Sequence, residues 1–240
     1  TARRSRRWAR PWPVSGSHDG VGKGASVRFR LTIEYAGTRY SGWQVQQNAR
    51  TVQGVLMEAI EGVVGTRSFE LQGSGRTDAG VHALGQVAHL DVATSLAPEL
   101  LRRGINDALP HDVNVLRIEQ ARHTFHARHD AVARSYLYHV ARRRTAFYKP
   151  FVWWVKEGLD VAAMQAAADQ LVGEHDFTSF ETTPSTRRSK VRTILSAAVA
   201  RQGGAVIVRD VVMGGPGALA GLTPGDNLNT DCVERIKVLS

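Results

Sequence analysis

The stretch GSGRTDAGVHALGQVAHLD, residues 73–91, combines a glycine-rich turn with the start of an apolar strand. Its glycines permit turn conformations and a close approach of the backbone to a ligand. Within the turn, Arg76 and Asp78 are separated by a single residue. In an extended segment the two side chains would lie on one face, where the guanidinium would lower the pKa of the carboxyl. A turn would separate them, and an ordinary ion pair that fixes a loop would have the same spacing.

The segments around this turn have patterns typical of strands and helices. Alternating residues predict strands on either side of it, at 69–73 and 86–92. Apolar residues at helical spacing predict a helix at 51–65, with Thr51 as its N-cap and Gly65 at its end. The other elements expected in this part of the chain are strands at 27–35 and 113–119 and a helix at 98–109.

The order of these elements, β-α-β-β-α-β, is that of the ferredoxin-like split motif. A similar order begins again with a strand at 134–140 and a helix at 160–173 capped by Asp160, before strands at 193–200 and 205–208. The sequence therefore predicts an α+β fold of two ferredoxin-like (RRM-like) halves, with antiparallel or mixed sheets around a central cleft. We expect the N-terminal half to span residues 27–130 and the C-terminal half, which is incomplete, to span 131–208.

Charge is distributed unevenly along the 240 residues, 42% of which are hydrophobic and 22% charged. The formal net charge is +9, but residues 1–30 alone carry eight Lys and Arg against one Asp, which leaves only +2 for the rest. The global charge is thus mostly a property of the N-terminal tail. We expect residues 1–26 to be a disordered basic extension, with a transit peptide or a nucleic-acid-binding arm as alternatives.

Several classes of site are disfavoured by the residues present. A single cysteine, Cys232, excludes an intramolecular disulfide and a cysteine-rich metal site, and no apolar run is long enough to span a membrane. His123, His126 and His129 recur at intervals of three, but no helix is expected there to align them. We therefore expect no bound metal, and a metal hydrolase built on Asp78 and these histidines is a distant alternative.

Several blocks of the sequence together resemble the TruA family of tRNA pseudouridine synthases. The most specific is GSGRTDAGVHALGQVAH, which is preceded by LTIEYAGTRYSGWQVQ and TVQGVLMEAI. It is followed, in the order of the family, by INDALPHDVNV, FHARHDAVARSYLYHV, LVGEHDFTSF and VRTI. The resemblance covers about residues 28–207.

The resemblance implies a reaction without a cofactor, in which the N1–C1′ bond of a uridine is broken and the base is rejoined through C5. Asp78 matches the essential aspartate of the family, which acts either as a nucleophile at C1′ or in proton abstraction from the sugar. Arg76 matches the position that orients the site and helps to displace the base. Tyr136 matches the active-site tyrosine, which stacks on the target base and assists removal of the C5 proton.

The same resemblance suggests further contacts and partners. We expect Gly75, Thr77, Gly80, His82 and Arg134 to contact the substrate. The implied substrate is the anticodon stem-loop of tRNA, and the family implies a cytoplasmic homodimer with no membrane association. Two basic stretches are expected to contact RNA phosphates rather than to be merely solvated loops. Their residues are Arg142, Arg143, Arg144, Lys149, Arg187 and Arg188.

The C-terminal region departs from the family pattern. The family continues into a helix that begins with Phe-Leu-(basic)-x-Met-Val-Arg, whereas residues 209–240 resemble a PDZ-like fragment or the product of a frameshift or fusion. Loss of the family segment is expected to leave an open sheet edge and to remove a positive partner of Asp78. The alternative functions are therefore a catalytically impaired tRNA-binding remnant and a fusion whose tail binds a protein or peptide.

Overall fold

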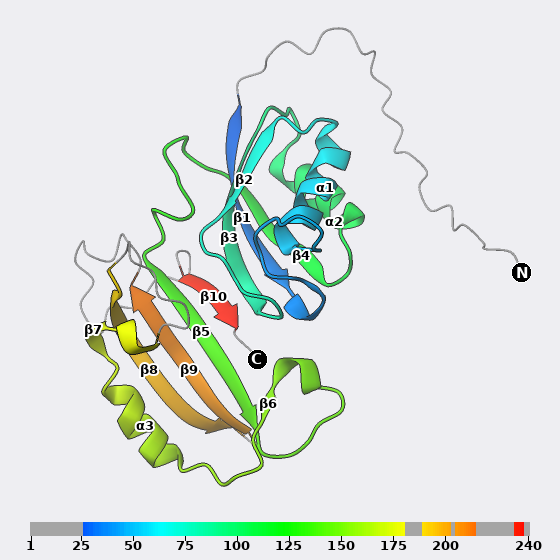
Figure 1. Cartoon of the computed structure of the whole chain (residues 1–240). Helices are drawn as coiled ribbons and strands as arrows, with labels where there is room; N and C mark the ends of the chain where they lie inside the picture. The colour runs from blue at the N-terminus through cyan, green and yellow to red at the C-terminus, as the bar shows by residue number, and fades with distance from the viewer. Residues whose placement is uncertain (1–25, 181–188, 203–204, 215–232, 238–240) are drawn as a thin grey trace, which may run out of the picture.

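The computed structural model describes residues 26–180, 189–202, 205–214 and 233–237. It has a mixed α+β architecture with few helices and a predominantly antiparallel sheet. The chain forms two halves, the first with two α-helices and the second with one α-helix packed on its part of the sheet (Figure 1). The expected N-terminal tail, Arg187, Arg188 and the PDZ-like stretch within 215–232 lie outside the described residues.

In the first half, two helices cover one face of four antiparallel strands (Figure 1). The strand order is β4-β1-β3, and β2 pairs with the second half of β3. The elements are β1 (Val27–Tyr35), α1 (Val52–Val64), β2 (Phe69–Gly73), β3 (His82–Val92), α2 (Pro98–Ala108) and β4 (Val113–Gln120), with a short 3-10 helix, η1 (Gly37–Arg39).

The core of this half follows from the sequence periodicity. Phe29, Leu31 and Ile33 alternate along β1 and pack against Leu56 of α1 and Ile105 of α2 in one buried cluster. The predicted ends of α1 are confirmed as well. The side chain of its N-cap threonine accepts a hydrogen bond from Gly54 N, and the glycine after the helix adopts a φ of 73°.

The second half is built on a long hairpin. Its elements are β5 (Ala133–Ala141), η2 (Lys149–Phe151), β6 (Trp153–Trp154), α3 (Val161–Asp169), β7 (Gly173–Asp176), η3 (Thr178–Phe180), β8 (Val191–Gln202) and β9 (Ala205–Gly214). The predicted helix at 160–173 is too long, because the chain turns after Asp169 and Gly173 begins β7. The strand predicted at 205–208 continues to Gly214, where its backbone pairs with Ala133 of β5.

The two halves are joined through β10 (Val233–Lys237). It pairs in parallel with β5 and antiparallel with the first residues of β3, so the sheet is continuous across both halves. The expectation of an open sheet edge is therefore wrong at this place, because a C-terminal strand pairs with the edge of β5 that faces β3. Sequence alternation did not predict this strand, since its pairing is with residues distant in the sequence.

Candidate functional site

The glycine-rich turn forms a loop, residues 74–81, between β2 and β3. The last backbone pair of β2 joins Gly73 to Ala88, and Ser74 N then donates to Val87 O at 2.8 Å. Beyond this point the chain leaves the sheet, and β10 takes the place beside residues 82–85 of β3. The loop therefore emerges where one neighbour of β3 ends and another begins, at the junction of the two halves.

The backbone just before Asp78 is held by the first half. Thr77 is buried, its carbonyl accepts a hydrogen bond from Trp43 N at 3.0 Å, and its hydroxyl lies 2.9 Å from the hydroxyl of Tyr35. Trp43 is itself 1% exposed and belongs to the buried core, so the loop is attached to the core of this half. Gly42 has a φ of 87° and packs directly against the Thr77 carbonyl.

The backbone after Asp78 is held in a similar way. Gly80 N donates to Tyr40 O at 3.2 Å, and Val81 N donates to Asp78 O at 3.3 Å, which closes a turn. Burial and a hydrogen bond to Asp112 raise the pKa of Tyr40 to about 12. Tyr40 therefore stays protonated at neutral pH and keeps donating to that carboxylate, which fixes its main chain beneath the loop.

Two side chains, one buried and one half-buried, hold the start of the loop by its carbonyl groups. Gln86 is fully buried in β3 and donates from Nε2 to Gly75 O at 2.8 Å. Arg134 of β5 donates from a terminal guanidinium nitrogen to Ser74 O at 2.8 Å, which connects the second half of the protein to the loop. This geometry gives Arg134 a positioning role, while its expected contact with substrate stays a prediction.

Arg76 and Asp78 are exposed at the tip of this fixed loop. Among the described residues, the structure gives no ion pair or hydrogen bond to either side chain. Their spacing thus does not produce the loop-fixing ion pair that was one interpretation of the sequence. An exposed carboxylate on a rigid backbone is accessible to a ligand, as a catalytic carboxylate must be.

His82 is buried at the end of the loop and is engaged through both ring nitrogens. Its Nδ1 accepts from Gly37 N at 3.2 Å, which leaves the proton on Nε2 to donate to Pro150 O at 2.9 Å. The ring also packs against Phe151 with centroids 4.8 Å apart. The structure therefore gives His82 a packing role, and a substrate contact by this residue stays a prediction.

Tyr136 is half-buried at the centre of β5. Its backbone pairs with Ile236 of β10, which pairs in turn with Ala83 of β3, so these three residues form a row across the sheet. Two strand spacings separate Tyr136 from Ala83, about 10 Å. The expected base-stacking tyrosine and the residues that follow the Asp78 loop are thus brought to the same region by strands from both halves.

Of the histidines at 123, 126 and 129, the last two pack ring against ring in a tilted arrangement, and His126 also packs against His89. The centroid of His126 lies 4.2 Å from His129 and 4.8 Å from buried His89. His126 Nδ1 accepts from the backbone amides of Arg128 and His129. In the part of the chain that the structure describes, no group of three or more His, Cys, Asp or Glu residues could hold a metal ion.

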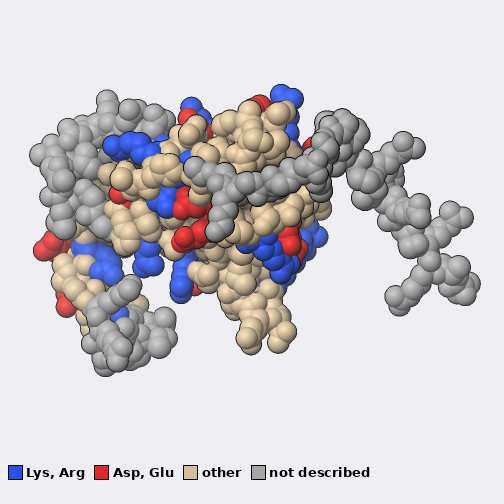
Figure 2. Space-filling view, turned by 90° about the horizontal axis from the view of Figure 1, so that it is seen from above, with Lys and Arg blue, Asp and Glu red and all other residues tan. Residues whose placement is uncertain are grey.

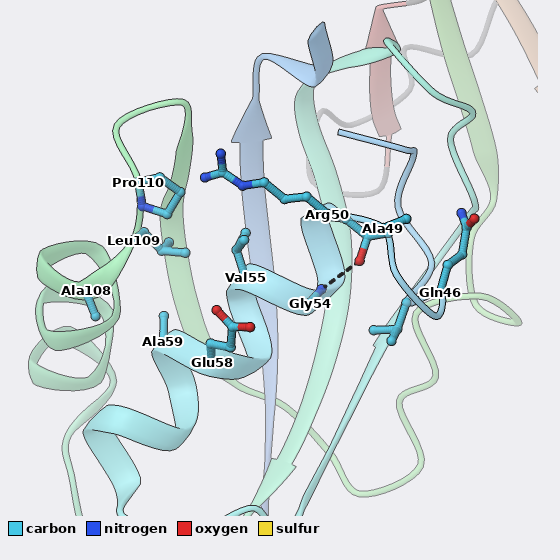
Figure 3. Close-up of a pocket in the computed structure, with 12 residues that line it drawn as sticks. Gln46, Ala49, Arg50, Gly54, Val55, Glu58, Ala59, Ala108, Leu109 and Pro110 are labelled. Carbon is cyan, nitrogen blue, oxygen red and sulfur yellow. Dashed lines mark hydrogen bonds between the residues drawn. The ribbon is translucent and has the colours of Figure 1, made fainter. Parts of the chain in front are cut away.

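A pocket lies elsewhere, between α1, the loop before it and the end of α2 (Figure 3). Its volume is about 760 Å³, and none of the expected site residues lines it. The first amides of α1 are already bonded, Gln53 N to Trp43 O and Gly54 N to Thr51 Oγ1. They therefore do not form an anion site, and the chemistry of the chain points to the 74–81 loop instead.

Charges are interspersed on the surface near both halves. Seen from above, Lys and Arg alternate with Asp and Glu on the visible face (Figure 2), as the small net charge after residue 30 leads one to expect. Of the expected phosphate contacts, Arg142, Arg143, Arg144 and Lys149 are exposed after β5.

Within the described residues, no helix is long and apolar enough to cross a membrane.

Comparison with known proteins identifies the family. A family model described as tRNA pseudouridine synthase matches residues 31–130 and 167–215. The chain therefore belongs to the tRNA pseudouridine synthase family, as the resemblance of its motifs predicted. The match includes the Asp78 loop and continues to the end of β9, past residue 207, but it leaves out 131–166, which contains Arg134 and Tyr136.

Curated relatives agree with this assignment. The tRNA pseudouridine synthase A of Nitrobacter hamburgensis is 45% identical over 184 residues, which cover 75% of each chain. That of Parvibaculum lavamentivorans is 45% identical over 177 residues, 72% of each chain. The enzyme of Brucella ovis is 41% identical over 187 residues, 76% of this chain and 74% of its own.

Proposed function

We propose that this protein is a tRNA pseudouridine synthase, an isomerase, and that Asp78 is its catalytic carboxylate. The family match and the names of the curated relatives support the activity. The observation that carries the assignment of Asp78 is its exposed side chain on a loop whose backbone is bonded on both sides, to Trp43 and Tyr40. Such a loop presents a carboxylate in one place without occupying its oxygens.

The reaction breaks the N1–C1′ bond of uridine, forms a C5–C1′ bond, and moves the hydrogen from C5 to solvent while N1 gains a proton. Asp78 serves either by attack on C1′ or by abstraction of a proton from the sugar, and both routes need an ionised carboxylate beside the ribose. Arg76, two residues away and also exposed, helps to displace the base. Tyr136 stacks on the target uracil, and no cofactor is required.

Finer features of the proposal follow the family resemblance. The two halves, divided near residue 130, are ferredoxin-like units, and the antiparallel order β4-β1-β3-β2 of the first half supports this for one of them. Gly75, Thr77, Gly80 and His82 line the substrate around Asp78. The substrate is a uridine in the tRNA anticodon stem-loop, and the enzyme acts in the cytoplasm as a homodimer.

The test uses the full chain and an unmodified tRNA transcript tritiated at C5 of its uridines. Formation of the C5–C1′ bond displaces the C5 hydrogen, so each conversion releases tritium into water. We expect release that stops when the uridines on the 3′ side of the anticodon are replaced by cytidine. Tight tRNA binding without any release would contradict the proposal and identify the chain as a catalytically impaired tRNA-binding remnant.

A further inference from the structure

The segment that connects β5 to α3 carries several exposed aromatic side chains. Phe147 is 90% exposed and Tyr148 66% exposed, and the tryptophans of β6 are 56% and 44% exposed. Large apolar side chains gathered in one exposed segment mark an interaction surface. We call residues 142–156 the aromatic loop.

The aromatic loop is also strongly basic. It holds five Lys and Arg residues and no acidic residue. One of its cations, Arg144, lies over the ring of Trp154 with its guanidinium carbon 5.4 Å from the ring centroid. Five cations without a carboxylate among them favour a polyanionic partner. Aromatic rings among cations are the combination that binds single-stranded nucleic acid.

The aromatic loop is fixed next to the proposed catalytic loop. Pro150 accepts a hydrogen bond from His82, and Phe151 packs against the same imidazole. Asp78 precedes His82 by four residues, a separation of at most about 14 Å along the chain. A stacked nucleic-acid strand covers that distance in about four nucleotides. A strand with its target uridine at Asp78 therefore has neighbouring nucleotides within reach of the aromatic loop.

We propose that Phe147 and Tyr148 stack on unpaired nucleobases that flank the target uridine, with Arg142, Arg143 and Lys149 bound to the adjoining phosphates. This inference rests on the proposed function and names the RNA feature that the site recognises. A duplex keeps its bases stacked on each other, so the aromatic loop selects single-stranded or loop nucleotides. Consecutive residues of a strand face opposite sides of the sheet. Trp153 and Trp154 are consecutive in β6, so they do not both stack on bases of the same RNA strand.

Binding of an unmodified tRNA transcript to the full chain tests this proposal. We expect Phe147→Ala to weaken binding by roughly tenfold and Phe147→Trp to restore it, because base–aromatic stacking tolerates any aromatic ring. The slope of affinity against salt stays unchanged in Phe147→Ala and falls in Arg143→Ala, since only the second variant removes a phosphate contact. Phe180→Ala is the matched control, because Phe180 is 76% exposed on η3 and lies outside the aromatic loop.

Competition identifies the kind of partner. A short oligouridylate should displace tRNA from the wild-type chain, lose affinity in Phe147→Ala, and outcompete a blunt RNA duplex. Unchanged tRNA and oligouridylate binding by Phe147→Ala would overturn the proposal. A change in oligomeric state or in vesicle binding, with RNA affinity intact, would overturn it in favour of a protein or membrane partner. These binding results are independent of tritium release, so failure of the aromatic loop and failure of the proposed catalysis are distinguishable.

Discussion

A methyl group added at Gly42 tests how closely catalysis depends on the position of the Asp78 loop. A Cβ built at this residue lies 2.5 Å from Thr77 O and 3.2 Å from Asp78 C. Ordinary contact begins at 3.4 Å, so the loop backbone must retreat by about 1 Å, a displacement that lowers rates by about a hundredfold at a reacting centre. We therefore expect Gly42→Ala to lower kcat about a hundredfold.

Stability changes for a second reason in the same variant. Gly42 has a positive φ of 87°, which costs a residue with a side chain about 1–2 kcal/mol, and the clash adds about 1–3 kcal/mol. Gly65→Ala is the matched control, because Gly65 has a φ of 73° but nothing within 4 Å of its added Cβ. The free energy of unfolding of Gly65→Ala should fall only by the cost of the backbone strain, about 1–2 kcal/mol, and its kcat should equal that of the wild type.

The assays are urea unfolding and tritium release at saturating tRNA, at a temperature where all three proteins are folded. If Gly42→Ala loses stability but retains the kcat of Gly65→Ala, the link between the Gly42 contact and the placement of Asp78 is wrong. If both variants lose kcat equally, backbone strain rather than loop displacement explains the loss.

Three further outcomes follow from individual contacts. Gln86→Met removes the hydrogen bond to Gly75 O while keeping a similar side-chain volume. Because one neutral hydrogen bond that positions the loop is lost, kcat should fall about tenfold, while KM for tRNA stays unchanged in steady-state assays. Leu56→Ala, in the core at 0% exposure, should lower the free energy of unfolding by about 2–5 kcal/mol in urea titrations, with kcat per folded molecule preserved. The hydrogen bond from Arg28 lowers the pKa of Asp91, so the pair stabilises the fold fully above the unfolded pKa of about 4, and this stabilisation is lost as the pH falls further. Asp91→Asn should therefore be less stable than wild type at neutral pH and should lose less stability on acidification. Unfolding measured at several pH values checks both expectations.

Local signals predicted much of the first half of the fold. The cap residues Thr51 and Gly65 act within a few residues of the helix that they bound, and the structure confirms both. The strand predicted at 86–92 begins earlier, at His82, because its first residues pair with β10. That pairing is between residues more than a hundred positions apart, and no alternation within HALG could have indicated it.

The candidate site shows the same division. The motif around Asp78 located the loop from its glycines and its family resemblance, but the contacts that hold the loop come from distant residues. Tyr35 reaches Thr77 across 42 positions, and Arg134 reaches Ser74 across 60. Gln86 had a local signal, since it is a polar amide at the first position of the strand predicted at 86–92.

Replacement of Asp78 by asparagine tests the central claim most directly. The two side chains have nearly the same shape, and the loop backbone is held by Trp43 and Tyr40 rather than by the carboxylate. We predict that Asp78→Asn binds the unmodified tRNA transcript as tightly as the wild-type chain and releases no tritium from its uridines. Tritium release by Asp78→Asn at the wild-type rate would contradict the assignment of Asp78 as the catalytic carboxylate.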